Sequence, residues 1–258
     1  MEIVGRGFLA RNLRVLEERH PDATVFAAGV SSTANTSLED YAREAGLLYD
    51  VIRRCQADRR RLVYLSTASA SMYGDGPSEE DGPVFPGSPF GRHKLALEAV
   101  LAASGVEFLV LRLAHAVGAH QRPHQLLPSF IRQIREGSLT VHRGAGRDLI
   151  DAADVVTIVD GLLRRGIGRE VFNVASGFPV AAEDIVALLE DRLGATAEKT
   201  FVERPQRHDI STTKLLSALP EAAGLGFGPG YHREVVDRYL RSTGVLPHPD
   251  RTARQLTN

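Results

Sequence analysis

Short apolar runs alternate with helical patterns along most of this chain of 258 residues. Between the runs, apolar side chains recur at helical spacing, with Leu9, Leu13 and Leu16 as the first example. Runs that stay apolar at successive positions are typical of strands buried on both faces of a parallel sheet. We therefore predict an α/β fold with a Rossmann-like, doubly wound parallel sheet. The predicted strands are Met1–Val4, Ala23–Ala28, Leu62–Ser66, Phe108–Leu113 and Val171–Ala175, and the predicted helices are Phe8–Arg19, Leu38–Cys55 and Gly91–Ala103.

The balance of charges limits the partners that we expect. Lys and Arg number 31 and Asp and Glu number 32, so the charge favours neither nucleic acid nor an anionic membrane. The single cysteine, Cys55, excludes an internal disulfide and is typical of a reducing compartment. No apolar run reaches the roughly 18 residues that a membrane helix needs, and no signal peptide is visible. We expect a cytoplasmic protein that acts on a small molecule and holds no metal.

A glycine-rich segment follows the first predicted strand. Val4–Ala10 contains the pattern G-x-G-x-x-A and leads directly into a predicted helix. Glycine permits a tight turn and lets the backbone approach a pyrophosphate, while the helix N-terminus offers free N–H groups and the positive end of its dipole. The placement of this segment between strand and helix predicts a dinucleotide site.

The order of the motifs resembles that of the extended short-chain dehydrogenases/reductases, the family of NAD-dependent epimerases and dehydratases. Gly5, Gly7, Phe8 and Leu9 follow the family's glycine loop, and residues 26–31 resemble the end of its fourth strand. Five later segments resemble family motifs in the family's order, namely residues 66–74, 86–98, 111–118, 146–155 and 172–177.

One part of the family's pattern is missing. In the family, two strands separate the glycine loop from the fourth strand, whereas only Arg11–Asp22 lies between them here. We therefore expect the second and third strands to be deleted. The deletion removes the acidic residue that in the family holds the adenosine ribose, about 20 residues after the glycine loop. Arg6 lies where it can meet a 2′-phosphate, so we expect NADP(H) to be favoured over NAD(H), with Arg11, Arg14 and Ser31–Thr33 as candidate helpers.

The resemblance also implies which residues contact the dinucleotide. They come from the glycine loop, from the ends of the following strands and from the helix that carries the family's active-site lysine. The predicted cofactor-binding residues are Gly5, Arg6, Gly7, Phe8, Leu9, Ala28, Gly29, Ser31, Lys94, Leu113 and His115.

The resemblance implies a catalytic site in which one residue is replaced. The family's Tyr-x-x-x-Lys pair falls on Phe90 and Lys94, which are about one helical turn apart. Phenylalanine has no hydroxyl and cannot transfer the proton that the family's tyrosine transfers. Counting along the family's serine motif selects either Thr67 or Ser69 as the active-site hydroxyl, and both remain candidates. We expect the substrate or water to supply the proton. The alternative protein donors are Thr67, Ser69, His93 and Tyr73.

The resemblance divides the chain into a dinucleotide-binding core, residues 1–119 and 144–194, and a small substrate lobe, residues 120–143 and 195–258. Basic side chains of the lobe can reach substrate phosphates or carbonyls, or can form a solvated loop, and they lack the compact spacing of metal ligands. These residues are His120, Arg122, His124, His142 and Arg143.

The combined pattern predicts an NADPH-dependent ketoreductase that reduces a carbonyl group of a natural product in antibiotic biosynthesis. A ketone that is activated by its own neighbouring phenol tolerates a missing protein acid, which favours an aromatic polyketide. The pattern is similar to that of the tyrosine-lacking ketoreductases of simocyclinone-type angucyclinone biosynthesis. Two alternatives stay open: a nucleotide-sugar reductase, epimerase or dehydratase, and a non-catalytic dinucleotide-binding sensor or scaffold. Leu38–Cys55 and Gly91–Ala103 can form the contact of a homodimer, or their apolar side chains can belong to the core.

Overall fold

The computed structural model describes residues 1–32, 37–74, 78–206 and 209–246. Its largest sheet has five parallel strands in the order β1-β2-β3-β4-β8. These strands are β1 (Glu2–Val4), β2 (Ala23–Phe26), β3 (Arg61–Thr67), β4 (Phe108–Leu113) and β8 (Glu170–Val174). The predicted Rossmann-like α/β fold is therefore confirmed.

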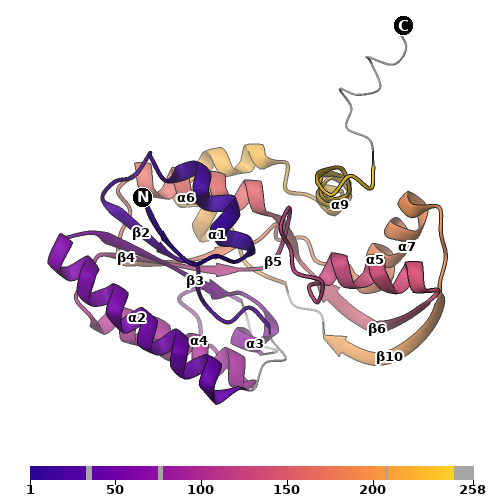
Figure 1. Cartoon of the computed structure of the whole chain (residues 1–258), viewed down its shortest axis with the longest axis horizontal. Helices are drawn as coiled ribbons and strands as arrows, with labels where there is room; N and C mark the ends of the chain where they lie inside the picture. The colour runs from indigo at the N-terminus through magenta and orange to yellow at the C-terminus, as the bar shows by residue number, and fades with distance from the viewer. Residues whose placement is uncertain (33–36, 75–77, 207–208, 247–258) are drawn as a thin grey trace, which may run out of the picture.

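Helices cover both faces of this sheet (Figure 1). They are α1 (Phe8–Leu13), α2 (Leu38–Asp58), α4 (Pro89–Ala103) and α6 (Ala152–Arg164). α2 and α4 lie on one face, where Tyr64 and Val110 of the strands pack into their apolar cluster. α1 and α6 lie on the other face, where Val63 and Leu111 join a second cluster. Because successive strand residues enter opposite clusters, most positions of these strands carry apolar side chains.

The sheet is shortened after its first strand. Beyond α1, a 3₁₀ turn, η1 (Arg14–Leu16), leads to β2, and residues 5–22, all of them described, form no strand. β1 therefore pairs directly with β2, with Ile3 opposite Val25. The predicted deletion of two strands is confirmed.

Local sequence explains where the two long helices begin. Ser37 caps α2 by accepting a hydrogen bond from the backbone N–H of Asp40 at 3.2 Å. Ser88 caps α4 by accepting one from Gly91 at 3.0 Å, and Pro89 occupies the first turn, where its missing N–H costs nothing. Across the described ranges, none of the helices combines the length and apolar character that crossing a bilayer requires.

The remaining elements surround a third apolar cluster. A three-stranded sheet has the order β10-β6-β9, and helices α5, α7 and α9 supply most of the other buried side chains. The strands of this part are β5 (His115–Val117), β6 (Ser138–Arg147), β7 (Leu149–Asp151), β9 (Val180–Ala181) and β10 (Glu198–Gln206). Its helices are α5 (Leu126–Glu136), α7 (Ala182–Leu193) and α9 (Tyr231–Ser242), while α8 (Thr213–Ala218) and the 3₁₀ helix η2 (Pro220–Leu225) pack on the larger sheet's cluster.

The third cluster, formed mainly by α5, α7 and α9, bears on the predicted domain boundaries. Ile185, Val186 and Leu189 of α7 pack with α5 and α9, although the sequence analysis assigns residues 144–194 to the dinucleotide-binding core. The predicted division into residues 1–119 and 144–194 against 120–143 and 195–258 stays a prediction, and residues 207–208 and 247–258 lie outside the described residues.

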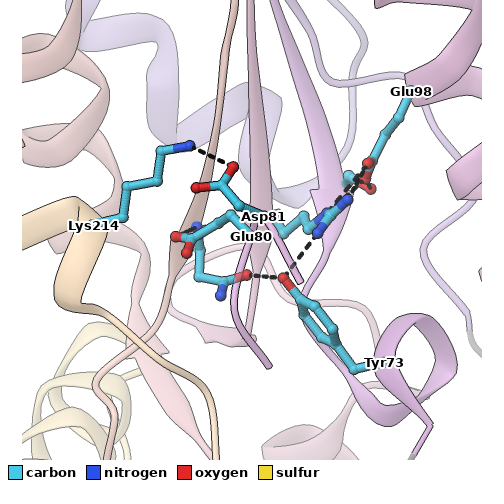
Figure 2. A network of polar contacts seen from close by, with 8 residues as sticks. Tyr73, Glu80, Asp81, Glu98 and Lys214 are labelled. Atoms are coloured by element: carbon cyan, nitrogen blue, oxygen red, sulfur yellow. Dashed lines mark hydrogen bonds and ion pairs between the residues drawn. The ribbon is translucent and has the colours of Figure 1, made fainter. Parts of the chain in front are cut away.

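A buried polar network lies near the carboxyl ends of the strands, and Figure 2 shows how its side chains face one another. Glu98 of α4 pairs with Arg112 of β4 at 2.7 Å, and Arg112 donates to the Tyr73 hydroxyl at 2.9 Å. Tyr73 donates to the Asn173 Oδ1 at 2.7 Å, and the backbone N–H of Asn173 donates to Glu80 at 2.7 Å. All five residues are buried. Each of these five residues therefore has a hydrogen-bond or ion-pair partner, which offsets the cost of its desolvation.

We expect Arg112→Met to lower the free energy of unfolding by about 3–5 kcal/mol, because the buried carboxylate of Glu98 loses its partner. The matched control is Arg165→Met, which breaks an ion pair with the exposed Glu221 and should cost far less, because solvent screens that pair. Urea unfolding followed by circular dichroism measures both values. Equal losses in the two variants would contradict a structural role for the network.

Candidate functional site

A cleft of about 740 Å³ opens where the parallel strands end. One wall consists of the loop after β1, residues 27–32 after β2, the end of β3 and residues 113–116 after β4. Open α/β sheets bind their ligands in this position, outside the carboxyl ends of the strands. The opposite wall comes from α5 and its flanking segments between residues 121 and 142, together with Arg147 and Ala182.

The glycine loop forms one end of this cleft. Gly5 has a φ of +139°, and a Cβ atom there would lie 2.5 Å from the carbonyl oxygen of Ala27, so only glycine fits between β1 and β2. Gly7 precedes α1, and a Cβ atom on it would meet only the Arg122 guanidinium, at 3.9 Å. No side chain caps the first turn of α1, so its N–H groups stay available for a phosphate. This backbone fits a dinucleotide pyrophosphate.

The cleft brings together almost all of the predicted cofactor-binding residues. Those that line it are Arg6, Gly7, Phe8, Leu9, Ala28, Gly29, Ser31, Lys94, Leu113 and His115. Gly5 lies behind the loop that it shapes. Ser32 also lines the cleft, whereas the candidate helpers Arg11 and Arg14 do not, and Thr33 lies outside the described residues. Their contact with a cofactor stays a prediction.

Thr67 and Ser69, the two candidate hydroxyls, lie side by side. Thr67 ends β3, and Ser69 is the N-cap of the short helix α3 (Ala70–Tyr73). Their hydroxyl oxygens are 2.9 Å apart, and both residues line the cleft. Both hydroxyls therefore lie within reach of one ligand atom, and the choice between them stays open.

Phe90 and Lys94 face the same cleft from the first two turns of α4. Lys94 Nζ lies 5.7 Å from the centre of the Phe90 ring and 5.3 Å from that of Tyr64. Position 90 therefore presents a hydrocarbon ring to the cleft and offers no proton.

Sequence reasoning missed the partner of the lysine. Lys94 Nζ donates to Glu44 Oε1 of α2 at 2.7 Å, and the two side chains are 4% and 1% exposed. The signal was present in the sequence, because Glu44 lies on the helical stripe of Tyr41, Leu48 and Val51, where an apolar residue is expected.

Two of the alternative proton donors lie away from the cleft. The Tyr73 hydroxyl is buried in the network of Figure 2, and burial raises the pKa of Tyr73 despite the opposing effect of Arg112. His93 stacks on Tyr41 with ring centres 4.4 Å apart, and its Nε2 lies 3.2 Å from Glu44 Oε2. Neither Tyr73 nor His93 lines the cleft, and their role as proton donors stays a prediction.

The charge of the cleft is one-sided. Among the described residues that line it there is no Asp or Glu. The basic side chains of the lining are Arg6, Lys94, Arg122 and Arg147, with His115, His124 and His142. Two predicted lobe residues do not take part: His120 lies off the cleft, and Arg143 stacks on Phe201 and pairs with Glu203 at 3.4 Å. This lining favours anionic ligands.

The sequence is similar to known proteins over most of its length. It is 26% identical over 243 residues to the "Low-salt glycan biosynthesis protein Agl12" of Haloferax volcanii. The match covers 86% of this chain and 73% of that protein. It is 25% identical over 182 residues to a dTDP-glucose 4,6-dehydratase of Streptomyces griseus, which covers 65% of this chain. The match spans 56% of the length of that dehydratase.

Solved structures share the fold. RMD from Pseudomonas aeruginosa, complexed with NADPH, matches with a TM-score of 0.77 at 20% identity, over 95% of this chain and 98% of that one. UDP-glucuronic acid 4-epimerase from Bacillus cereus, in complex with UDP-glucuronic acid and NAD, matches with a TM-score of 0.73 at 20% identity, over 91% and 79%. The sequence profile described as "NAD dependent epimerase/dehydratase family" matches residues 9–175, more than half of the chain. The chain therefore belongs to the NAD-dependent epimerase/dehydratase family.

Proposed function

We propose that this protein is an NAD(P)(H)-dependent oxidoreductase that acts on the carbonyl or carbinol carbon of a nucleotide-diphosphate sugar. The observation that carries the proposal is the acid-free, basic lining of the cleft. His124 and His142 lie on the wall opposite the loop after β1, where they can bind the phosphates of a second ligand. Two of the similar proteins are a dTDP-glucose 4,6-dehydratase and a UDP-glucuronic acid 4-epimerase, which also supports a sugar nucleotide.

The chain's own residues bind, orient and polarise in this proposal. When bound, the nicotinamide dinucleotide supplies or accepts the hydride. Backbone N–H groups after Gly7 hold its pyrophosphate, and the Lys94 ammonium donates to its ribose. The hydroxyls of Thr67 and Ser69 donate to the substrate oxygen. In the direction of reduction, that oxygen takes one proton from water or from a substrate hydroxyl, because Phe90 has none to give.

We further propose that NADP(H) is preferred over NAD(H). Arg6 is exposed at the cleft and forms no ion pair with a carboxylate of the described residues. Ser31 and Ser32 stand nearby on the same lining, and the shortened sheet carries no strand whose end would supply a ribose-binding acid. A guanidinium and two hydroxyls suit a 2′-phosphate better than a 2′-hydroxyl.

A second candidate is the reduction of an aromatic polyketide ketone, as in the tyrosine-lacking ketoreductases of angucyclinone biosynthesis. Phe90, Leu113 and Phe130 form apolar parts of the cleft lining, on which a flat aromatic substrate can stack. A phenol beside the ketone supplies the proton that position 90 lacks. The basic lobe wall favours the sugar nucleotide over this uncharged substrate.

A panel of ligands separates the two candidates. With the protein saturated by NADP⁺, we expect calorimetry to detect UDP, GDP or dTDP, with the matching monophosphate bound about tenfold more weakly. NADPH oxidation is then followed with nucleoside-diphosphate 4-ketohexoses and, separately, with an angucyclinone ketone. Turnover of the polyketide without binding of any nucleoside diphosphate would overturn the sugar-nucleotide proposal.

Two arginines give different predictions for cofactor binding. Arg6→Ala should weaken NADPH binding about tenfold or more and leave NADH unchanged, because only NADPH carries the 2′-phosphate. Arg122→Ala should weaken both by the same factor, because the guanidinium lies over the glycine loop where the shared pyrophosphate binds. The control is Arg135→Ala, an exposed arginine of α5 outside the cleft. Nucleotide fluorescence measures each dissociation constant, and an Arg6→Ala protein that kept the full preference for NADPH would contradict the proposed role.

A tyrosine at position 90 tests whether the site is adapted to work without that hydroxyl. We expect Phe90→Tyr to change kcat by less than about tenfold, because the proton already comes from water or substrate. Phe90→Leu is the control for ring volume. Steady-state reduction of a substrate from the panel gives the comparison, and a gain of about 10²–10⁴ in kcat would mean that the native site is impaired rather than adapted.

A further inference from the structure

Glu44 is a buried charge at the meeting point of four chain segments. It lies on α2 and is 2% exposed. Its Oε1 accepts from Lys94 of α4 at 2.7 Å and from the Tyr64 hydroxyl of β3 at 3.0 Å. Its Oε2 accepts from the backbone N–H of Val30 at 2.7 Å and lies at ion-pair distance, 3.2 Å, from His93 Nε2. Such a set of donors stabilises an ionised carboxylate away from water.

The space for the ion pair depends on Gly29. A Cβ atom at this position would lie 2.6 Å from Lys94 Nζ and 2.7 Å from Glu44 Oε1. Gly29 and Lys94 both line the cleft, whereas Glu44 does not. The Glu44 carboxylate thus contacts the Lys94 ammonium on the side away from the cleft. Because Gly29 has no side chain, the ammonium can lie at the cleft wall. Among the described residues Nζ donates to Glu44 alone, so two of its three N–H donors remain for a ligand.

The charge on Lys94 depends on this partner. Burial lowers the pKa of Lys94, and the nearby carboxylates of Glu44 and Glu98 oppose that effect. Burial alone would raise the pKa of Glu44, but His93, Lys94 and the N–H of Val30 hold it at about 2. Glu44 therefore stays ionised over the whole working range of pH, and its negative charge favours the protonated form of Lys94.

We propose that Glu44 is a positioning residue that keeps Lys94 as an ammonium ion and fixes its Nζ beside Gly29. Held in this way, Lys94 supplies the positive charge that a site without a phenol at position 90 presents to the dinucleotide ribose and to the oxygen that gains charge on hydride transfer. The second half of this role depends on the proposed oxidoreductase function, while the first half concerns the chain and its dinucleotide alone.

Removal of the negative charge at constant size tests the first half. Wild-type NADPH binding, followed by fluorescence from pH 6 to 10.5, should weaken only where Lys94 loses its proton. We call the weakening of binding at high pH the alkaline limb of the profile. In Glu44→Gln its midpoint should fall by about one pH unit or more, because a buried ammonium without a counter-ion deprotonates more easily. Lys94→Met should bind about tenfold more weakly at neutral pH and show no such limb, which assigns the limb to Lys94.

The neighbouring titratable groups define the controls. Those that face the pair are Tyr64 on β3, Tyr41 on α2, and His93 and Glu98 on α4. Burial raises the pKa of both tyrosines, so neither accounts for a limb that moves downward. His93→Gln separates the imidazole from the lysine, and it should leave the alkaline limb in place. Glu39→Gln, an exposed carboxylate on the first turn of the same helix, is the matched surface control and should also leave the limb unchanged.

Thermal unfolding of each variant shows whether the fold is intact. If Glu44→Gln does not fold, Glu44→Asp keeps the charge but lengthens the ion pair, and the limb should still move down, by less than in the amide. An unmoved limb in a folded Glu44 variant would overturn the proposal. The titration contains no substrate, so a failed substrate panel with a shifted limb rejects the proposed function alone, and turnover with an unmoved limb rejects the role of Glu44 alone.

Discussion

The ion pair between Lys94 and Glu44 joins the four chain segments that surround one wall of the cleft. The two residues are 50 positions apart in the chain, yet their 2.7 Å contact ties α4 to α2 and, through Tyr64 and the N–H of Val30, to β3 and the loop after β2. A pair buried this deeply is costly unless every charge is matched. The same contact therefore fixes the helix packing and sets the charge at the cleft wall.

The shortened sheet and the side chains of Phe90 and Lys94 shape two ends of the same cleft. β1 pairs directly with β2, and Arg6 and the serines after β2 line the cleft at that end of the sheet. At the other end, Phe90 and Lys94 line the cleft together with Thr67 and Ser69. The described lining of the cleft carries basic side chains and no carboxylate, which suits a phosphate-rich pair of ligands.

The sequence predicted features that are local or that follow a shared pattern. The apolar strands, the deletion after α1, the Gly5 turn and the adjacency of Thr67, Phe90 and Lys94 all depend on short segments whose order the family preserves. The pairing of Glu44 was not predicted because a carboxylate on an apolar stripe indicates a buried charge but not which residue, 50 positions away, pairs with it. The packing of α7 with α5 and α9 escaped for the same reason, since only the tertiary fold decides which cluster an amphipathic helix joins.

The proposed function requires that a sheet without its second and third strands still holds a nicotinamide dinucleotide. Fluorescence titration of the purified wild-type protein with NADPH and, separately, with NADH decides this. We predict saturable NADPH binding in the micromolar range, roughly −8 kcal/mol, with NADH bound more weakly. If a protein that melts cooperatively bound neither nucleotide at millimolar concentration, the deletion would have abolished the site, and a non-catalytic scaffold would replace the oxidoreductase.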